Sequence, residues 1–319
     1  YLTGHAQDAQ GRAFGFQVTF FRSRVDGTQA LKSRLAAKQL VFAHAAITDV
    51  QGQRLWHDER IARWNGEPPA ATGRGVFALE ADTHVALGDW FIQRRPDGVT
   101  TTRVSGETLR IAIDATPTQA ILLQGERGFS RKGPDPVQST FYVSQPQLSV
   151  SGTLALQGQT FTLTGGKAWL DHEWSEALLH PEAVGWDWIG MNLFDGGALT
   201  AFRVRRADGS ALWAGGSLRG VDGTLQVFAH DAVQFTPLRH WSSPASGARY
   251  PVQWQVDTPA GRFTVNALVD DQELDSSAST GAIYWEGLCS LQKPTGPGQE
   301  ARAGQGYLEM TGYARPLQL

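Results

Sequence analysis

The residues best suited to catalysis lie within 166–192, GKAWLDHEWSEALLHPEAVGWDWIGMN. This segment contains the run Asp171-His172-Glu173-Trp174. Side chains alternate between the two faces of an extended strand, so His172 and Trp174 should share one face while Asp171 and Glu173 share the other. Carboxylates on both sides of an imidazole can set its pKa and its tautomer. We therefore predict Asp171, His172 and Glu173 as catalytic acid–base groups.

The same segment also fits a purely structural role. Tryptophan-rich segments more often form core than a site, and a histidine between aromatics is usually hydrogen-bonded within the fold. In the functional interpretation, Trp174 lines an apolar ligand site together with Trp186 and Trp188, which share a face of the following stretch. His172 and His180 are eight positions apart with no third ligand nearby, so we predict no metal.

Two further groups of residues could serve a pocket. His44 follows the alternating run QLVFA and could either line a barrel or pack structurally. The triplets YWE at 284–286 and YLE at 307–309 each place a tyrosine and a glutamate on one face of a strand. These glutamates could be solvated on an edge strand, or they could face a pocket and transfer protons. We predict His44, Tyr284 and Glu286 as ligand-binding residues.

Several classes of function lack their sequence signatures. There is no Gly-x-Ser-x-Gly elbow and no phosphate-binding glycine loop, and Cys289, the single cysteine, has no evident histidine partner. The formal net charge of −3 does not favour a nucleic-acid partner. No apolar run is long enough to predict a transmembrane segment. We expect no cofactor.

The elements around these residues read as β-strands. Alternating apolar runs such as FGFQVTFF end in tight-turn signals, and Asp-Gly recurs at 26, 97, 195, 208 and 222. Residues 250–269 predict a hairpin that turns at TPAG, and only residues 30–39 show a helical pattern. Strands at this spacing predict an all-β sandwich or barrel. The abrupt start at Tyr1 is what a removed leader, or a trimmed chain, would leave.

The motifs, taken together, resemble one family. YLTGHA, FGFQVTFFR, FAHAAITD, YVSQPQLSVSGTL, GKAWLDHEWS, GWDWIGMNL, FRVRRADG, YWEG and GYLEMTGY follow in order along the chain. This pattern resembles the AttH-like group of predicted secreted hydrolases, which is related to carotenoid 1,2-hydratases. The resemblance implies two packed antiparallel lipocalin-like β-barrels, at 1–176 and 177–319, and a periplasmic or secreted location. It also implies a hydrophobic ligand, and we assign Tyr142 to the ligand site.

The resemblance carries over only in part to residue roles. Carotenoid hydratases add water to an isolated isoprenoid double bond without a cofactor, and their His-x-Trp matches His172 and Trp174. Their tyrosine and aspartate on the following strand have no counterpart in residues 199–204, LTAFRV. The resemblance thus favours a hydro-lyase or isomerase acting on an isoprenoid or lipid-like molecule in a barrel. The alternatives are a non-catalytic carrier of hydrophobic ligands associated with a membrane transport system, or a scaffold.

Overall fold

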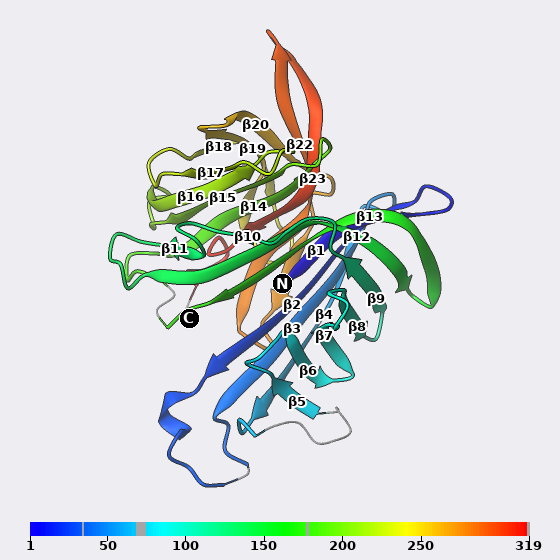
Figure 1. Cartoon of the computed structure of the whole chain (residues 1–319), viewed down its shortest axis with the longest axis vertical. Helices are drawn as coiled ribbons and strands as arrows, with labels where there is room; N and C mark the ends of the chain where they lie inside the picture. Colours follow the sequence, from blue (N-terminus) through cyan, green and yellow to red (C-terminus); the bar gives the residue numbers. More distant parts are fainter. Residues whose placement is uncertain (34, 68–74, 177–178, 318–319) are drawn as a thin grey trace.

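The fold is built almost entirely of β-strands. The computed structural model describes residues 1–33, 35–67, 75–176 and 179–317. They form 23 strands and one 3₁₀ turn, η1 (Asp26–Thr28), in two antiparallel sheets (Figure 1). The prediction of an all-β fold is confirmed. The helix expected at 30–39 is wrong for the described residues of that stretch, and residue 34 lies outside them.

The first sheet contains thirteen strands in the order β4-β3-β2-β1-β13-β12-β9-β8-β7-β6-β5, with β10 and β11 also paired to β12. Its end strands β4 and β5 come into contact, so the sheet is a nearly closed barrel. The bounds are β1 (Leu2–Asp8), β2 (Ala13–Arg24), β3 (Gln39–Asp49), β4 (Arg54–Trp64), β5 (Gly75–Ala78), β6 (His84–Gly88), β7 (Trp90–Arg94), β8 (Thr100–Ser105), β9 (Leu109–Thr116), β10 (Leu122–Leu123), β11 (Phe129–Arg131), β12 (Ser139–Leu156) and β13 (Gln159–Trp174).

The second sheet contains ten strands in the order β17-β16-β15-β14-β23-β22-β20-β19-β18, with β21 also paired to β22. Phe228 at one edge and Phe235 at the other belong to one core, so this sheet also wraps around its own interior. The bounds are β14 (Gly185–Leu193), β15 (Ala198–Arg205), β16 (Ala211–Arg219), β17 (Leu225–Phe228), β18 (Gln234–Ser242), β19 (Arg249–Thr258), β20 (Gly261–Ala267), β21 (Glu273–Ser276), β22 (Ala282–Gly296) and β23 (Gln299–Met310). The hairpin predicted for 250–269 is confirmed as β19–β20.

Residue alternation explains which face of each strand turns inward. In β2, Phe14, Phe16 and Val18 are fully buried in the first core, while Gln17 and Thr19, on the other face of the strand, point outward. Burying such an apolar side chain stabilises the fold by about 1.5–3 kcal/mol. Gln17 and Thr19 are nonetheless buried, because the outer face of this part of the barrel is covered by the second sheet.

The two sheets pack through their outer faces. The long strands β12 and β13 cross the centre of the molecule and contact β14 of the second sheet (Figure 1). A separate apolar cluster fills this interface, with Trp169 from β13 and Trp188 from β14 among its members. Polar contacts also cross it, such as Thr48 Oγ1 donating to Gln272 Oε1 at 2.7 Å. The interface therefore combines apolar packing with buried polar groups.

The chain leaves the first sheet at Trp174 and enters the second at Gly185. The domain boundary expected between residues 176 and 177 stays a prediction, because residues 177–178 lie outside the described part of the chain. None of the helices in the described residues is long and apolar enough to span a membrane.

Candidate functional site

The carboxylate of Asp171 is the centre of a buried hydrogen-bond network between the two sheets. Tyr142 Oη donates to Asp171 Oδ2 at 2.6 Å, and Ser144 Oγ and Trp169 Nε1 donate to Oδ1 at 2.6 and 2.7 Å. Strand pairing explains the arrangement, because Ser144 lies directly across from Asp171 on β12. Burial raises the pKa of Asp171 to about 6, although the three hydrogen bonds act against that rise. Asp171 is therefore mainly ionised at neutral pH and rigidly oriented.

Trp188 connects this network to the second sheet. Its Nε1 donates to Tyr142 Oη at 3.0 Å, so the phenol accepts from Trp188 while it donates to Asp171. The indole is held in place by Gly190, since a Cβ there would lie 2.3 Å from the Trp188 ring. It also meets Trp169 edge-on, with ring centroids 6.3 Å apart. Two indole rings and a phenol thus surround one carboxylate.

Two glutamates from the second sheet face the same interface. Glu286 on β22 and Glu309 on β23 are directly paired across neighbouring antiparallel strands, which places their side chains on one face. Glu286 is 2 % exposed. Burial, followed by the charge of Glu309, raises the pKa of Glu286 well above its ordinary value. Burial raises the pKa of Glu309 to about 7. The pair therefore retains at least one proton at neutral pH.

Two buried oxygen atoms beside this pair have no well-aligned hydrogen bond among the described residues, although their two side chains interact with each other. They are Tyr1 Oη and Glu286 Oε1. Tyr1 packs edge-on against Trp188, with ring centroids 5.4 Å apart, so it belongs to the same aromatic wall. Buried polar atoms are nearly always hydrogen-bonded, and the contact between the Tyr1 hydroxyl and the Glu286 carboxyl serves this purpose here. Tyr1 therefore belongs to the polar lining around the glutamate pair.

Lys132 adds a positive charge at the side of the network. Its Nζ pairs with Glu173 at 2.7 Å and lies 4.5 Å from the ring centroid of Tyr142 and 4.3 Å from that of Phe202. Thr140 Oγ1 also donates to Glu173. Glu173 thus shares a face with Asp171, as predicted, but it serves mainly as the partner of Lys132.

His172 and Trp174 lie on the opposite face of β13 from Asp171. Both are exposed, and Trp174 stacks on Phe141, with ring centroids 5.5 Å apart. The His172 ring meets the Trp174 ring edge-on, with ring centroids 5.2 Å apart. The alternation predicted for this run is therefore present, and it separates His172 from the buried network. Trp186, on the same strand as Trp188, is partly buried in the interface cluster.

His44 lies in a second buried network that reaches Tyr284. The His44 ring shares hydrogen bonds with Tyr284 Oη through Nδ1 at 2.8 Å and with Ser279 Oγ through Nε2 at 3.2 Å. Ser279 Oγ in turn donates to Glu59. Burial lowers the pKa of His44 to about 4, so the imidazole is neutral and can donate at one nitrogen while accepting at the other. Tyr284 and Glu286 share a face of β22, which places this network beside the glutamate pair.

The glutamates at 286 and 309 are not on an edge strand, so the solvated-edge alternative is wrong. Strands β22 and β23 are central in the second sheet. Sequence reasoning identified Glu309 by its shared face with Tyr307 but did not place it in the site. It missed Tyr1, Ser144 and Trp169 as site residues, because the pairing of β1 and β12 with β13, which brings Tyr1 and Ser144 to Asp171, has no local signal in the sequence.

The strand that follows β13 is β14, and it carries Asp187. This carboxylate points toward the second barrel's own core and pairs with Arg203 Nε at 2.6 Å and Arg205 Nε at 3.1 Å. It therefore lies apart from the network of Asp171. Within the described residues, no group of three or more histidine, cysteine or acidic side chains is placed to bind a metal ion.

Comparison with known proteins places this arrangement in a family. The family model described as AttH-like matches residues 1–313. The chain belongs to the AttH-like family. A crystal structure from Nitrosomonas europaea assigned as AttH (NE1406) is 41 % identical, with a TM-score of 0.86 over 98 % of this chain and 91 % of that one.

More distant structures share the fold of this AttH-like chain. Kievitone hydratase from Nectria haematococca is 15 % identical, with a TM-score of 0.74 over 98 % of this chain and 88 % of its own. CghA in complex with Sch210972 is 13 % identical, with a TM-score of 0.58 over 98 % of this chain and 87 % of the CghA chain. The search of curated proteins found no match. The expected fold of lipocalin-like sheets is confirmed.

Proposed function

We propose that the chain binds an apolar, isoprenoid or lipid-like small molecule between its two sheets and performs cofactor-free acid–base chemistry on it, of the hydratase or isomerase type. One observation carries the proposal. A glutamate pair that holds a proton at neutral pH faces the same buried interface as Asp171, which is mainly ionised there. Acid–base pairs whose environments set their pKa values apart are typical of catalytic sites.

The geometry supports a simple reaction sequence. The glutamate pair transfers a proton to one alkene carbon, and the neighbouring carbon becomes a cation. The faces of Trp169 and Trp188 stabilise such a cation by about 0.5–2 kcal/mol each. Water adds to the cation and gives its extra proton to Asp171, whose carboxylate has about four acceptor positions, of which three are taken. Return of that proton to the glutamate pair restores the starting state, and H and OH have been added.

Isomerisation uses the same groups without the water. After protonation, loss of a proton from a different carbon to Asp171 moves the double bond. Tyr142 acts as a positioning residue in both cases, because its hydroxyl bridges Asp171 and Trp188. The structural relatives include a protein named as a hydratase, which agrees with this class of chemistry.

A carrier is the alternative function. The interface would then hold a hydrophobic ligand and release it unchanged. The association with a membrane transport system and the periplasmic or secreted location remain predictions. The exposed aromatic pair Trp174 and Phe141 favours a route for apolar molecules at the surface of the first sheet. The catalytic role predicted for His172 from the sequence is untested and competes with a site between the sheets, and the His172→Ala variant distinguishes the two.

The test separates enzyme from carrier. Native mass spectrometry of protein purified from its own source identifies the apolar compound it carries. That compound is then incubated with the protein in D2O. An enzyme that protonates carbon incorporates deuterium at carbon, whereas a carrier returns the compound unlabelled. Absence of deuterium in any recovered ligand would remove the proposed chemistry and leave the carrier.

A further inference from the structure

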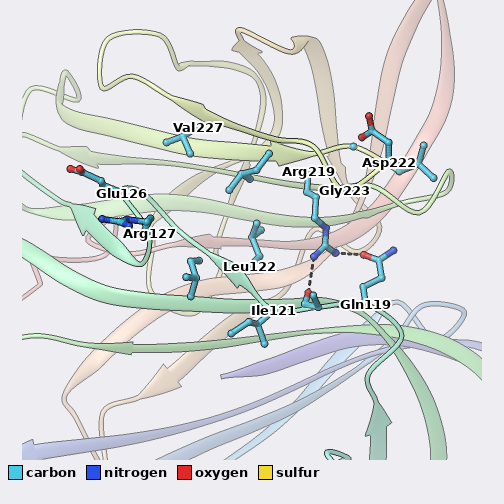
Figure 2. A pocket seen from close by; sticks show the side chains of 15 residues that line it. Gln119, Ile121, Leu122, Glu126, Arg127, Arg219, Asp222, Gly223 and Val227 are labelled. Carbon is cyan, nitrogen blue, oxygen red and sulfur yellow. Dashed lines mark hydrogen bonds between the residues drawn. The ribbon is translucent and has the colours of Figure 1, made fainter.

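A groove lies on the outer surface between residues 119–127 and the end of β16 with β17 (Figure 2). Its volume is about 730 Å³, within the range of about 300–1,000 Å³ that is typical of small-molecule sites. None of its lining residues belongs to the network around Asp171 and Glu286. The groove is therefore a separate feature of the molecule.

The walls of the groove are apolar and exposed. Ile121 and Leu123 come from β10 and the residue before it, and Val221, Leu225 and Val227 come from the turn after β16 and from β17. Val221 is 73 % exposed and Ile121 is 56 % exposed. Single exposed apolar residues are common, but these five line one groove together, where an apolar chain could cover them.

Arg219 gives one end of this groove a buried positive charge. The residue is only 7 % exposed, and its Nη1 donates to the carbonyl oxygen of Ala120 at 2.8 Å (Figure 2). Its Nη2 donates to the side-chain oxygen of Gln119. Both acceptors are neutral, and these bonds use only part of the five N–H donors of a guanidinium. Among the described residues, no carboxylate forms a salt bridge with Arg219.

Two other arginines of this sheet, one buried and one partly buried, do have a carboxylate partner. Arg203 and Arg205 both pair with Asp187, as expected for buried charges. The acids that line the groove do not play this part for Arg219. Asp222 accepts hydrogen bonds from its own turn at Thr224. Arg219 is thus a buried cation that lacks a counter-ion within the described chain.

We propose that this groove binds an amphiphile with an apolar chain and a carboxylate head, such as a fatty acid, with the carboxylate at Arg219 and the chain along Ile121, Leu123 and Val227. A carboxylate can accept two parallel N–H bonds from a guanidinium, which neutral acceptors cannot replace electrostatically. The apolar walls then cover the chain. This site is independent of the chemistry proposed between the sheets.

Isothermal titration with dodecanoate and dodecanol tests the head-group claim. We expect one dodecanoate to bind, at least tenfold more tightly than dodecanol. Arg219→Gln should weaken dodecanoate binding at least tenfold and leave dodecanol binding unchanged. Arg206→Gln is the matched control, because Arg206 directly follows β15, lies outside the groove and pairs with Glu182. Equal affinity for the two compounds, or an unchanged dodecanoate affinity in Arg219→Gln, would overturn the proposal.

A second pair of variants tests the location and remains informative if Arg219→Gln fails to fold. Val221→Asp changes an exposed turn residue of the groove and should weaken the binding of both dodecanoate and dodecanol. Val137→Asp changes an exposed valine outside the groove and should leave the binding of both compounds unchanged. Glu286→Gln, between the sheets, should leave dodecanoate binding intact. Loss of binding in Glu286→Gln together with full binding in Val221→Asp would place the ligand between the sheets and refute the groove.

Discussion

Replacing Glu309 by glutamine should change how stability depends on pH. The pKa of Glu309 is raised by burial from its ordinary 4.5 to about 7. Between these values the folded protein keeps a proton that the unfolded chain has already lost. The free energy of unfolding of the wild type therefore falls as pH rises through this window, and this contribution levels off above about pH 7.

The size of the effect follows from the pKa change. One pKa unit corresponds to about 1.4 kcal/mol, so ionising Glu309 destabilises the folded wild type by about 3 kcal/mol at alkaline pH. Glutamine has nearly the same shape and does not ionise. The free energy of unfolding of Glu309→Gln, measured relative to wild type, should therefore rise by about 3 kcal/mol between pH 4.5 and pH 8.

Urea denaturation followed by circular dichroism at a series of pH values measures this difference. Glu107→Gln is the control for the loss of a glutamate, because Glu107 is exposed in the turn between β8 and β9 and lies far from the glutamate pair in the chain. Parallel curves for Glu309→Gln and wild type from pH 4.5 to 8 would show that Glu309 ionises freely. Glu309 would then hold no proton between the sheets at neutral pH.

Two further substitutions test the packing around the site. Asp187→Asn leaves the buried guanidinium groups of Arg203 and Arg205 without their carboxylate, so we expect the free energy of unfolding to fall by about 3–5 kcal/mol in urea denaturation, and a loss below about 1 kcal/mol would contradict this. Gly152 has a φ of +129°, and a Cβ there would lie 2.0 Å from the carbonyl oxygen of Ala112. Gly152→Ala should destabilise the fold by about 1–3 kcal/mol, and an unchanged melting temperature would argue against this close approach.

The strands could be predicted from the sequence because their signals are local. The alternation of Phe14, Phe16 and Val18 reports a half-buried strand, and TPAG within 250–269 marks a real turn between β19 and β20. The same two-residue alternation correctly predicted that His172 and Asp171 lie on opposite faces of β13. The prediction of a helix at 30–39 failed because a short pattern without caps competes poorly with loop structure.

The site could be predicted only in part, because it depends on which outer faces meet. Alternation shows that Asp171 and His172 point in opposite directions, but it does not show which face the second sheet covers. Glu286 and Glu309 look like solvated strand residues until β22 and β23 are known to be central. Tyr1 had no local signal, since its role comes from contact with Trp188 of the other sheet.

The most direct test of the account compares two variants in one labelling experiment. The apolar compound recovered from the protein is incubated in D2O with wild type, Glu286→Gln and His172→Ala, and deuterium at carbon is measured by mass spectrometry. Positioned acids and bases typically contribute about 10²–10⁴-fold to rate, so we predict at least a 100-fold slower incorporation for Glu286→Gln and a change of only a few-fold for His172→Ala. Full incorporation by Glu286→Gln, with its loss in His172→Ala, would contradict a catalytic site between the two sheets.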